Sequence, residues 1–210
     1  ATFQGGSFDA FVTKLAPAGN ALTYSTYLGG GSDDHAQAIA VDGSGQAFVA
    51  GYTWSTNFPT LNPLQGSNAG ARDVFVTKMA AAGNSLAYST YLGASANDYA
   101  HGIAVTSGGT AYVVGETASS TFPMVQAQQA TYGGGNSDGF LAALAVAGNG
   151  LEYSTFLGGS ATDIAWAVAQ SGGSVVVAGE TGSTNFPVAA AFDATFNGAP
   201  SDAFLARLLF

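Results

Sequence analysis

The sequence predicts an all-β chain in which four-stranded antiparallel units repeat in tandem, as in a β-propeller-type array. Three observations predict it: a period of about 64 residues, short apolar runs with the alternation of strands, and turn residues between those runs. An Asp-x-Phe segment begins at Asp9, Asp73, Asp138 and Asp202. Because a fixed long period indicates one supersecondary unit copied along the chain, the repeat predicts the architecture before any local feature does.

Two further motifs recur in the same order within each period. The segment YSTYLG or YSTFLG begins at Tyr24, Tyr88 and Tyr153, and the pattern GxTxSxxFP begins at Gly51, Gly115 and Gly179. We therefore interpret residues 1–210 as a single repeat array. Its units cover approximately residues 1–30 (partial), 31–93, 94–158 and 159–210.

Within one unit, four β-prone runs follow each other. Residues 36–41 alternate small and large side chains, and the turn cluster DGSG separates them from a second run at residues 46–53. A loop rich in Pro, Gly and Asn leads to a third run at residues 73–79, and a Gly-Asn turn leads to a fourth at residues 86–92. Short strands joined by tight turns and repeated in tandem are typical of propeller blades, and no useful length shows helical periodicity.

The first run of each unit is the expected innermost strand. Its small residues permit close approach of neighbouring units near a central axis: Ala38, Ala40, Gly102, Ala104, Ala167 and Ala169. Their alternating partners are expected to fill the layer between units: Ile39, Val41, Ile103, Val105 and Val168.

The number of strands does not divide into complete blades. Two strands in residues 8–30 precede two complete units at residues 36–93 and 100–158, and three strands follow in residues 165–210. About three blades are fewer than the roughly four to eight of a closed propeller. The chain is therefore expected either to be part of a longer propeller or to share strands with other chains in a ring or a filament.

Composition narrows the classes of partner. Only 8% of the residues are charged, against about 25% in an average soluble domain. The net charge of −9 disfavours nucleic acid, and no apolar run approaches the roughly 18 residues of a membrane span. Cysteine is absent, which leaves no disulfide framework. Abundant Gly, Ser, Thr and Asn favours an extracellular or cell-surface location.

The four motifs together resemble a known family. The segments DAFV, YSTYLGG, GIAV followed after a turn by AYVVG, and TxSxxFP are similar to the bacterial SBBP-type β-propeller repeat. The resemblance spans essentially the whole chain. It implies a β-propeller architecture in secreted or surface-exposed bacterial proteins, commonly within larger chains, and it implies no common catalytic residues.

Repeated carboxylates are the first candidate site. Asp34, Asp98 and Asp163 recur in the turn before the inner strand. One interpretation is that they accept backbone N–H bonds within the turns, and the alternative is a repeated calcium site. We expect no cofactor unless calcium occupies these positions.

Aromatic and acidic side chains that break the repeat are the second candidate site. Trp54 lies in the loop after a second strand, and Tyr52 aligns with Glu116 and Glu180. These four residues are a candidate ligand-binding surface, with a surface glycan as the ligand. The histidines have no spacing typical of a zinc site, which leaves no recognisable catalytic set.

The sequence thus favours a non-enzymatic extracellular or cell-surface structural or interaction protein. We expect a homo-oligomer or filament, or association with the remainder of a longer propeller, through strand pairing. A carbohydrate- or ligand-binding module is the alternative, and a hydrolase or lyase domain is the third hypothesis.

Overall fold

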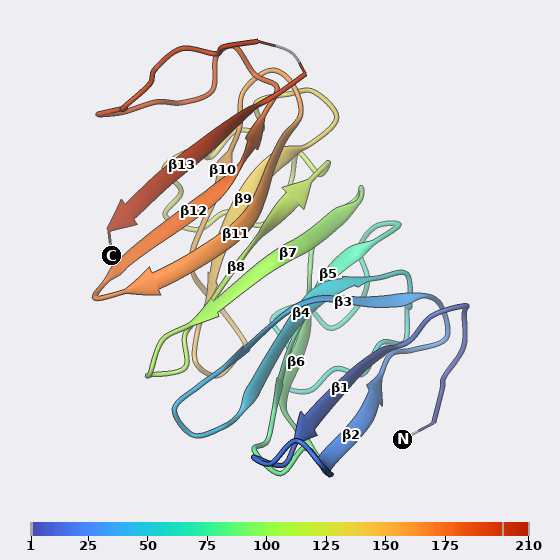
Figure 1. The fold of residues 1–210 in the computed structure, drawn as a ribbon. Helices are drawn as coiled ribbons and strands as arrows, with labels where there is room; N and C mark the ends of the chain where they lie inside the picture. Colours follow the sequence, from blue (N-terminus) through green and yellow to red (C-terminus); the bar gives the residue numbers. More distant parts are fainter. Residues whose placement is uncertain (1, 199, 210) are drawn as a thin grey trace.

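The computed structural model describes residues 2–198 and 200–209, and all regular structure in these residues is β-strand. Figure 1 shows the chain as a stack of sheets. The strands are β1 (Ala10–Leu15), β2 (Leu22–Leu28), β3 (Asp34–Val41), β4 (Ala47–Thr53), β5 (Asp73–Met79), β6 (Leu86–Leu92), β7 (Asp98–Val105), β8 (Ala111–Thr117), β9 (Asp138–Leu144), β10 (Leu151–Leu157), β11 (Asp163–Ser171), β12 (Ser174–Thr181) and β13 (Asp202–Leu209).

The strands form four antiparallel sheets. Two sheets have four strands each, in the orders β3-β4-β5-β6 and β7-β8-β9-β10. The pair β1-β2 and the three strands β11-β12-β13 form the other two, at opposite ends of the stack in Figure 1. The all-β prediction is confirmed, and within the described residues the sheets do not close into a propeller.

The strands follow the predicted runs closely. β5 and β6 occupy residues 73–79 and 86–92 as predicted, whereas β3 begins two residues earlier than the predicted run. The earlier start has a physical reason, because Asp34 is in register with Thr53 and His35 with Tyr52. The pairing between β3 and β4 therefore extends two residues into the segment that the sequence predicted to be a turn.

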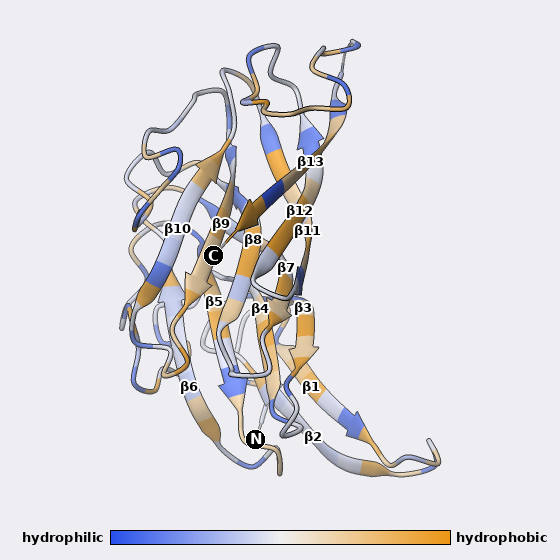
Figure 2. Ribbon diagram, turned by 90° about the vertical axis from the view of Figure 1, so that its left-hand side faces the viewer, coloured by the Kyte–Doolittle hydropathy of each residue, from blue (hydrophilic) through white to orange (hydrophobic). Residues whose placement is uncertain are grey.

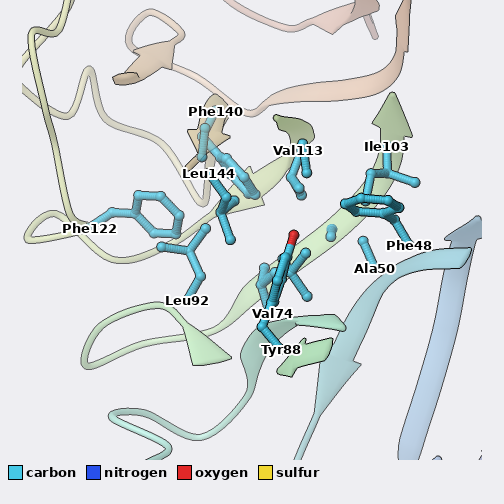
Figure 3. Packing of buried hydrophobic residues seen from close by; sticks show 14 of the residues in the cluster. Phe48, Ala50, Val74, Tyr88, Leu92, Ile103, Val113, Phe122, Phe140 and Leu144 are labelled. Carbon is cyan, nitrogen blue, oxygen red and sulfur yellow. The ribbon is translucent and has the colours of Figure 1, made fainter. Parts of the chain in front are cut away.

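Hydrophobic layers between neighbouring sheets hold the stack together. In Figure 2 the hydrophobic stretches lie along the strands. The central layer joins Phe48, Val74 and Tyr88 of one four-stranded sheet to Val113 and Phe140 of the next (Figure 3). Because each side chain in this layer is buried, the layer contributes roughly 1.5–3 kcal/mol for each large apolar residue.

Small residues allow the inner strands to approach closely, as predicted. A Cβ atom on Gly102 of β7 would lie 3.1 Å from the Trp166 carbonyl oxygen and 3.3 Å from the Ala167 Cα atom of β11. A larger side chain at this position would push β11 away from β7. The innermost strands thus pack almost backbone to backbone.

One prediction about the inner strands is wrong for the first complete sheet. Ile103 is only 9% exposed and fills the layer between sheets as expected, but Ile39 and Val41 are 57% and 60% exposed. The reason is that the preceding sheet consists of β1 and β2 alone and has no inner strands to cover them.

The hairpin turns also join neighbouring sheets. Gly148 has a φ of 73°, in the left-handed region that glycine adopts without steric cost, and its N–H donates to the Ala145 carbonyl oxygen at 2.8 Å. The Tyr88 ring of the preceding sheet packs against its Cα atom, and Gly83 meets Tyr24 in the same way. Each turn therefore fits a tyrosine of the sheet before it.

Candidate functional site

Two aspartates flank one glycine at each junction between sheets. At the central junction, a Cβ atom on Gly93 would lie 2.8 Å from Asp73 Oδ1 and 2.7 Å from Asp98 Oδ2. Asp73 begins β5, Gly93 follows β6, and Asp98 begins the inner strand of the next sheet. We call this arrangement a carboxylate pair. It recurs as Asp9 and Asp34 at Gly29, and as Asp138 and Asp163 at Gly158.

The second aspartate of each pair is well supplied with hydrogen-bond donors. Asp98 Oδ1 accepts the Thr117 hydroxyl, and Oδ2 accepts the Ala94 N–H at 2.8 Å and the Ser119 hydroxyl at 3.1 Å. Asp34 accepts the equivalent bonds from Thr53, Gly30 and Ser55, and Asp163 accepts those from Gly159 and Ser183. These carboxylates do accept backbone N–H bonds, as one of the two interpretations expected, and the donor lies four residues earlier.

The first aspartate of each pair has one oxygen without a donor. Asp73 Oδ2 accepts the Ala69 N–H at 2.8 Å and the Gln65 side-chain amide at 2.9 Å. Its Oδ1 is buried and has no hydrogen-bond partner. The Oδ1 atoms of Asp9 and Asp138 are in the same situation, and in the third pair Oδ1 of the second aspartate, Asp163, also lacks a partner. A repeated buried oxygen that faces a second carboxylate needs an explanation.

Burial raises the pKa of four of these carboxyl groups. It raises the pKa of Asp98 to about 6 against the opposing hydrogen bonds, and the Asp73 charge adds to the increase. Burial likewise raises the pKa of Asp138 to about 6, with a contribution from Asp163. The pKa values of Asp34 and Asp73 are raised for the same main reason. Each pair therefore has a high affinity for a proton.

The donors around each pair determine what it can bind. N–H and O–H groups occupy most carboxylate oxygens, whereas Ca²⁺ takes about six to eight oxygen ligands. In the part of the chain that the structure describes, no group of three or more His, Cys, Asp or Glu residues could hold a metal ion. Calcium at Asp34, Asp98 and Asp163 stays a prediction, and the donor-free oxygens of the pairs suit a proton.

The aromatic candidates belong to a row of rings across the starts of the inner strands. Neighbouring ring centroids along this row lie between 4.4 and 6.4 Å apart. In order, the rings are Phe8, His35, Tyr52, Tyr99, His101 and Trp166. Sequence reasoning did not predict the row, because the rings come from five different segments of the chain.

Trp54 lies beside this row and is capped by a cation. Its ring is 5.4 Å from that of Tyr52, and the Arg72 guanidinium lies 4.2 Å from the Trp54 ring centroid. Arg72 also donates a hydrogen bond to the Tyr99 hydroxyl. The guanidinium thus occupies one face of the Trp54 ring.

The two glutamates occupy different surroundings. Glu116 lies 3.4 Å from His101 Nε2 and accepts the Ser137 hydroxyl at 2.6 Å. Burial opposes its ionisation, but these hydrogen bonds outweigh that effect and lower its pKa. Glu180 instead accepts the Ser201 hydroxyl at 3.4 Å and lines a shallow cavity of about 330 Å³. Of the four predicted ligand-binding residues, Tyr52, Trp54 and Glu116 are therefore linked through the row.

Comparison with known proteins supports the reading of the repeat. The family model SBBP, a beta-propeller repeat, matches residues 23–59. The match confirms the resemblance. It covers Asp34 and the two hydroxyl groups of Thr53 and Ser55 that bind it, so these contacts lie within the SBBP repeat.

The match to one repeat leaves the role of the chain open. No curated protein matches the chain. The described residues form no helix of the length and apolarity needed to cross a membrane.

Proposed function

We propose that the chain is a non-enzymatic structural and interaction protein, extracellular or on the cell surface, completed by strands from other chains or segments. The observation that carries the proposal is the presence of incomplete sheets beside complete ones. β13 holds the third position of its sheet, and among the described residues no fourth strand lies outside it, whereas β6 and β10 fill that position in the four-stranded sheets.

The opposite end is incomplete in the complementary way. β1 pairs with β2 but has no strand at the position where β4 pairs with β5. The absence of inner strands leaves Ile39 and Val41 exposed. Unpaired edges next to exposed apolar side chains favour the addition of further strands. Other repeats of a longer protein or another copy of the chain can supply them.

A structural role also agrees with the carboxylates. Each pair repeats at every junction, and its oxygens bind backbone N–H groups and hydroxyl groups of the scaffold itself. Groups that recur in this way and bind within the fold support the junctions between sheets. The small fraction of charged residues, 8%, supports a location outside the cytoplasm.

Strand addition can be tested with a peptide. A fluorescent peptide with the sequence of residues 151–158, which forms β10 in its own sheet, is expected to bind the outer edge of β13 and to raise its fluorescence anisotropy. The matched control is the same peptide with Ser154→Pro and Thr155→Pro, since proline removes backbone donors from the ladder. Equal binding of both peptides, or binding of neither, would contradict the proposal.

Ligand binding at the aromatic row is a second candidate function. The observation that favours it is the 47% exposed Trp166, whose ring lies 4.4 Å from His101 at one end of the row. A glycan array should then give hits that both Trp166→Ala and Trp54→Ala weaken. An array without hits, or hits that neither substitution affects, would exclude a glycan role for these rings.

A further inference from the structure

The layers between sheets repeat one contact. In each layer, an aliphatic residue on the third strand of one sheet shares a hydrophobic cluster with a phenylalanine on the third strand of the next sheet. The pairs are Val12 with Phe75, Val76 with Phe140, and Leu141 with Phe204. Every third strand therefore presents an aliphatic side chain to the following sheet and a phenylalanine to the preceding one.

At each end of the stack, one residue of this repeated contact has no partner sheet to pack against. Phe11 is 68% exposed, although Phe75 and Phe140 are fully buried and Phe204 is 9% exposed at the same position. Leu205 is 76% exposed, although Val12, Val76 and Leu141 are at most 2% exposed. One chain thus carries both halves of its own internal contact, uncovered and at opposite ends of the stack (Figure 1).

Exposed apolar side chains lie beside Phe11 and Leu205 at the two ends of the stack. We define the N-terminal end face as Phe11, Leu15, Leu22 and Tyr27, all of which are exposed. At the equivalent positions in the next sheet, Phe75, Met79 and Tyr91 are buried and Leu86 packs against the same layer. We define the C-terminal end face as Leu205 and Leu209 of β13, both exposed.

We propose that the C-terminal end face of one copy packs on the N-terminal end face of a second copy, with Leu205 against Phe11. The inference rests on the proposed function in that it requires assembly, and it adds the partner and the contact. A second copy would continue the stack, because the contact between Leu205 and Phe11 repeats the three internal ones. Such a head-to-tail contact extends into a filament unless the rotation per copy closes a ring.

Stacking of faces requires no rearrangement of the chain. β13 pairs with β12 from Asp202 to Leu209, and Phe204 stacks on Phe186 with 4.6 Å between ring centroids. Strand exchange, in which β1 of a second copy takes the place of β13, would first have to break these contacts. The observations therefore favour stacked end faces over exchanged strands.

The first test is association measured by light scattering over a concentration series. We expect the unaltered chain to associate, and Leu205→Asp and Phe11→Asp each to raise the dissociation constant at least tenfold (about 1.4 kcal/mol). Val146→Asp, an exposed aliphatic position in the β9–β10 turn, is the control and should change nothing. Because the side chains of Phe11 and Leu205 are mostly exposed, unchanged circular dichroism should confirm that the variants fold.

The second test is chemical crosslinking between copies, which benefits from a chain without native cysteine. Phe11→Cys and Leu205→Cys, placed on separate chains and mixed, should join through a bis-maleimide that spans about 10 Å, the spacing of stacked sheets. A disulfide between Thr13→Cys on one chain and Val177→Cys on another would instead indicate strand exchange and overturn the inference.

The outcomes separate the two proposals. If the strand peptide binds but the end-face substitutions leave the dissociation constant unchanged, the stacking inference is wrong and the proposed function stands. A chain that stays monomeric at every concentration also overturns the stacking inference. The proposed function fails with it only if the peptide does not bind either.

Discussion

Asp73 Oδ1 and Asp98 Oδ2 face the same side of Gly93, but only the Asp98 oxygen accepts hydrogen bonds. Two buried carboxylates at such a junction repel each other when both are ionised. The donor-free oxygen of Asp73 is the position where a proton relieves that repulsion without displacing an existing hydrogen bond. The two members of the pair therefore differ in the substitutions that they tolerate.

Asparagine at the two positions should have opposite effects. In Asp73→Asn, the amide oxygen can keep the bonds from Ala69 and Gln65 while the NH₂ group points toward Asp98. We expect a gain of about 1 kcal/mol in the free energy of unfolding. In Asp98→Asn, one orientation places the NH₂ group against the Ala94 N–H, and the other places it against the Thr117 hydroxyl, which already accepts the Ser119 N–H. We expect a loss of about 1–3 kcal/mol. Urea unfolding at about pH 7.5 measures both, and shifts of equal sign would contradict the assignment.

Stability should fall as the pH rises from about 4 to about 6.5. The folded-state pKa values of Asp98 and Asp138 are raised from 3.8 to about 6, so a proton bound by each carboxylate pair favours the folded state. This stability is fully present below pH 3.8 and is lost as the pH rises through about 6, by up to about 3 kcal/mol for Asp98. The lowered pKa of Glu116 acts in the opposite direction.

Melting temperatures at several pH values check this dependence. The control is Asp73→Asn, which removes one charge from the central pair and should reduce the slope. The same series with added Ca²⁺ and then with a chelator tests calcium at the pairs. A melting temperature that rises between about pH 4 and pH 6.5 would show that the pairs do not bind protons in this range.

Gly93 should not tolerate a side chain. In Gly93→Ala, the new Cβ atom would meet Asp98 Oδ2 at 2.7 Å and the Asp73 carboxylate at 2.8 Å. We expect a loss of about 1–3 kcal/mol from this overpacking. Gly150→Ala is the matched control, because nothing lies within 4 Å of its Cβ position. A loss no greater at Gly93 than at Gly150 would mean that the carboxylates move apart freely.

The repeat made the strands predictable from sequence. The contacts between repeat units could be predicted only in part. Alternating side chains and turn residues indicate strands wherever they occur, which is why β5 and β6 have the predicted bounds. The pairing of Asp73 with Asp98 crosses a junction between sheets, and local patterns do not report such contacts. Their constant separation in each unit, with the glycine of YSTYLG between them, was a usable signal.

The aromatic row could not be predicted, for a different reason. The other units have different residue types at the positions equivalent to Tyr52, Tyr99 and Trp166. Alignment of the units therefore gives no sign that these three side chains belong together. They meet because the starts of the inner strands converge when the sheets stack. The exposure of side chains at the ends of the stack could not be predicted either. Phe11 and Phe75 have the same local sequence pattern and differ only in which residues cover them.

The two tyrosines of the YSTYLG motif differ in the hydrogen bonds of their hydroxyl groups. The Tyr88 hydroxyl is buried without a hydrogen-bond partner, whereas the Tyr91 hydroxyl accepts the Phe58 N–H at 2.9 Å and donates to the Ser55 carbonyl oxygen at 2.7 Å. Tyr88→Phe should therefore leave stability unchanged or raise it, because it removes an unpaired polar group. Tyr91→Phe should lower the free energy of unfolding by about 1–3 kcal/mol, because it leaves two buried backbone groups unpaired. Urea unfolding of the two variants compares them directly, and an equal loss in both would mean that the Tyr88 hydroxyl has a partner.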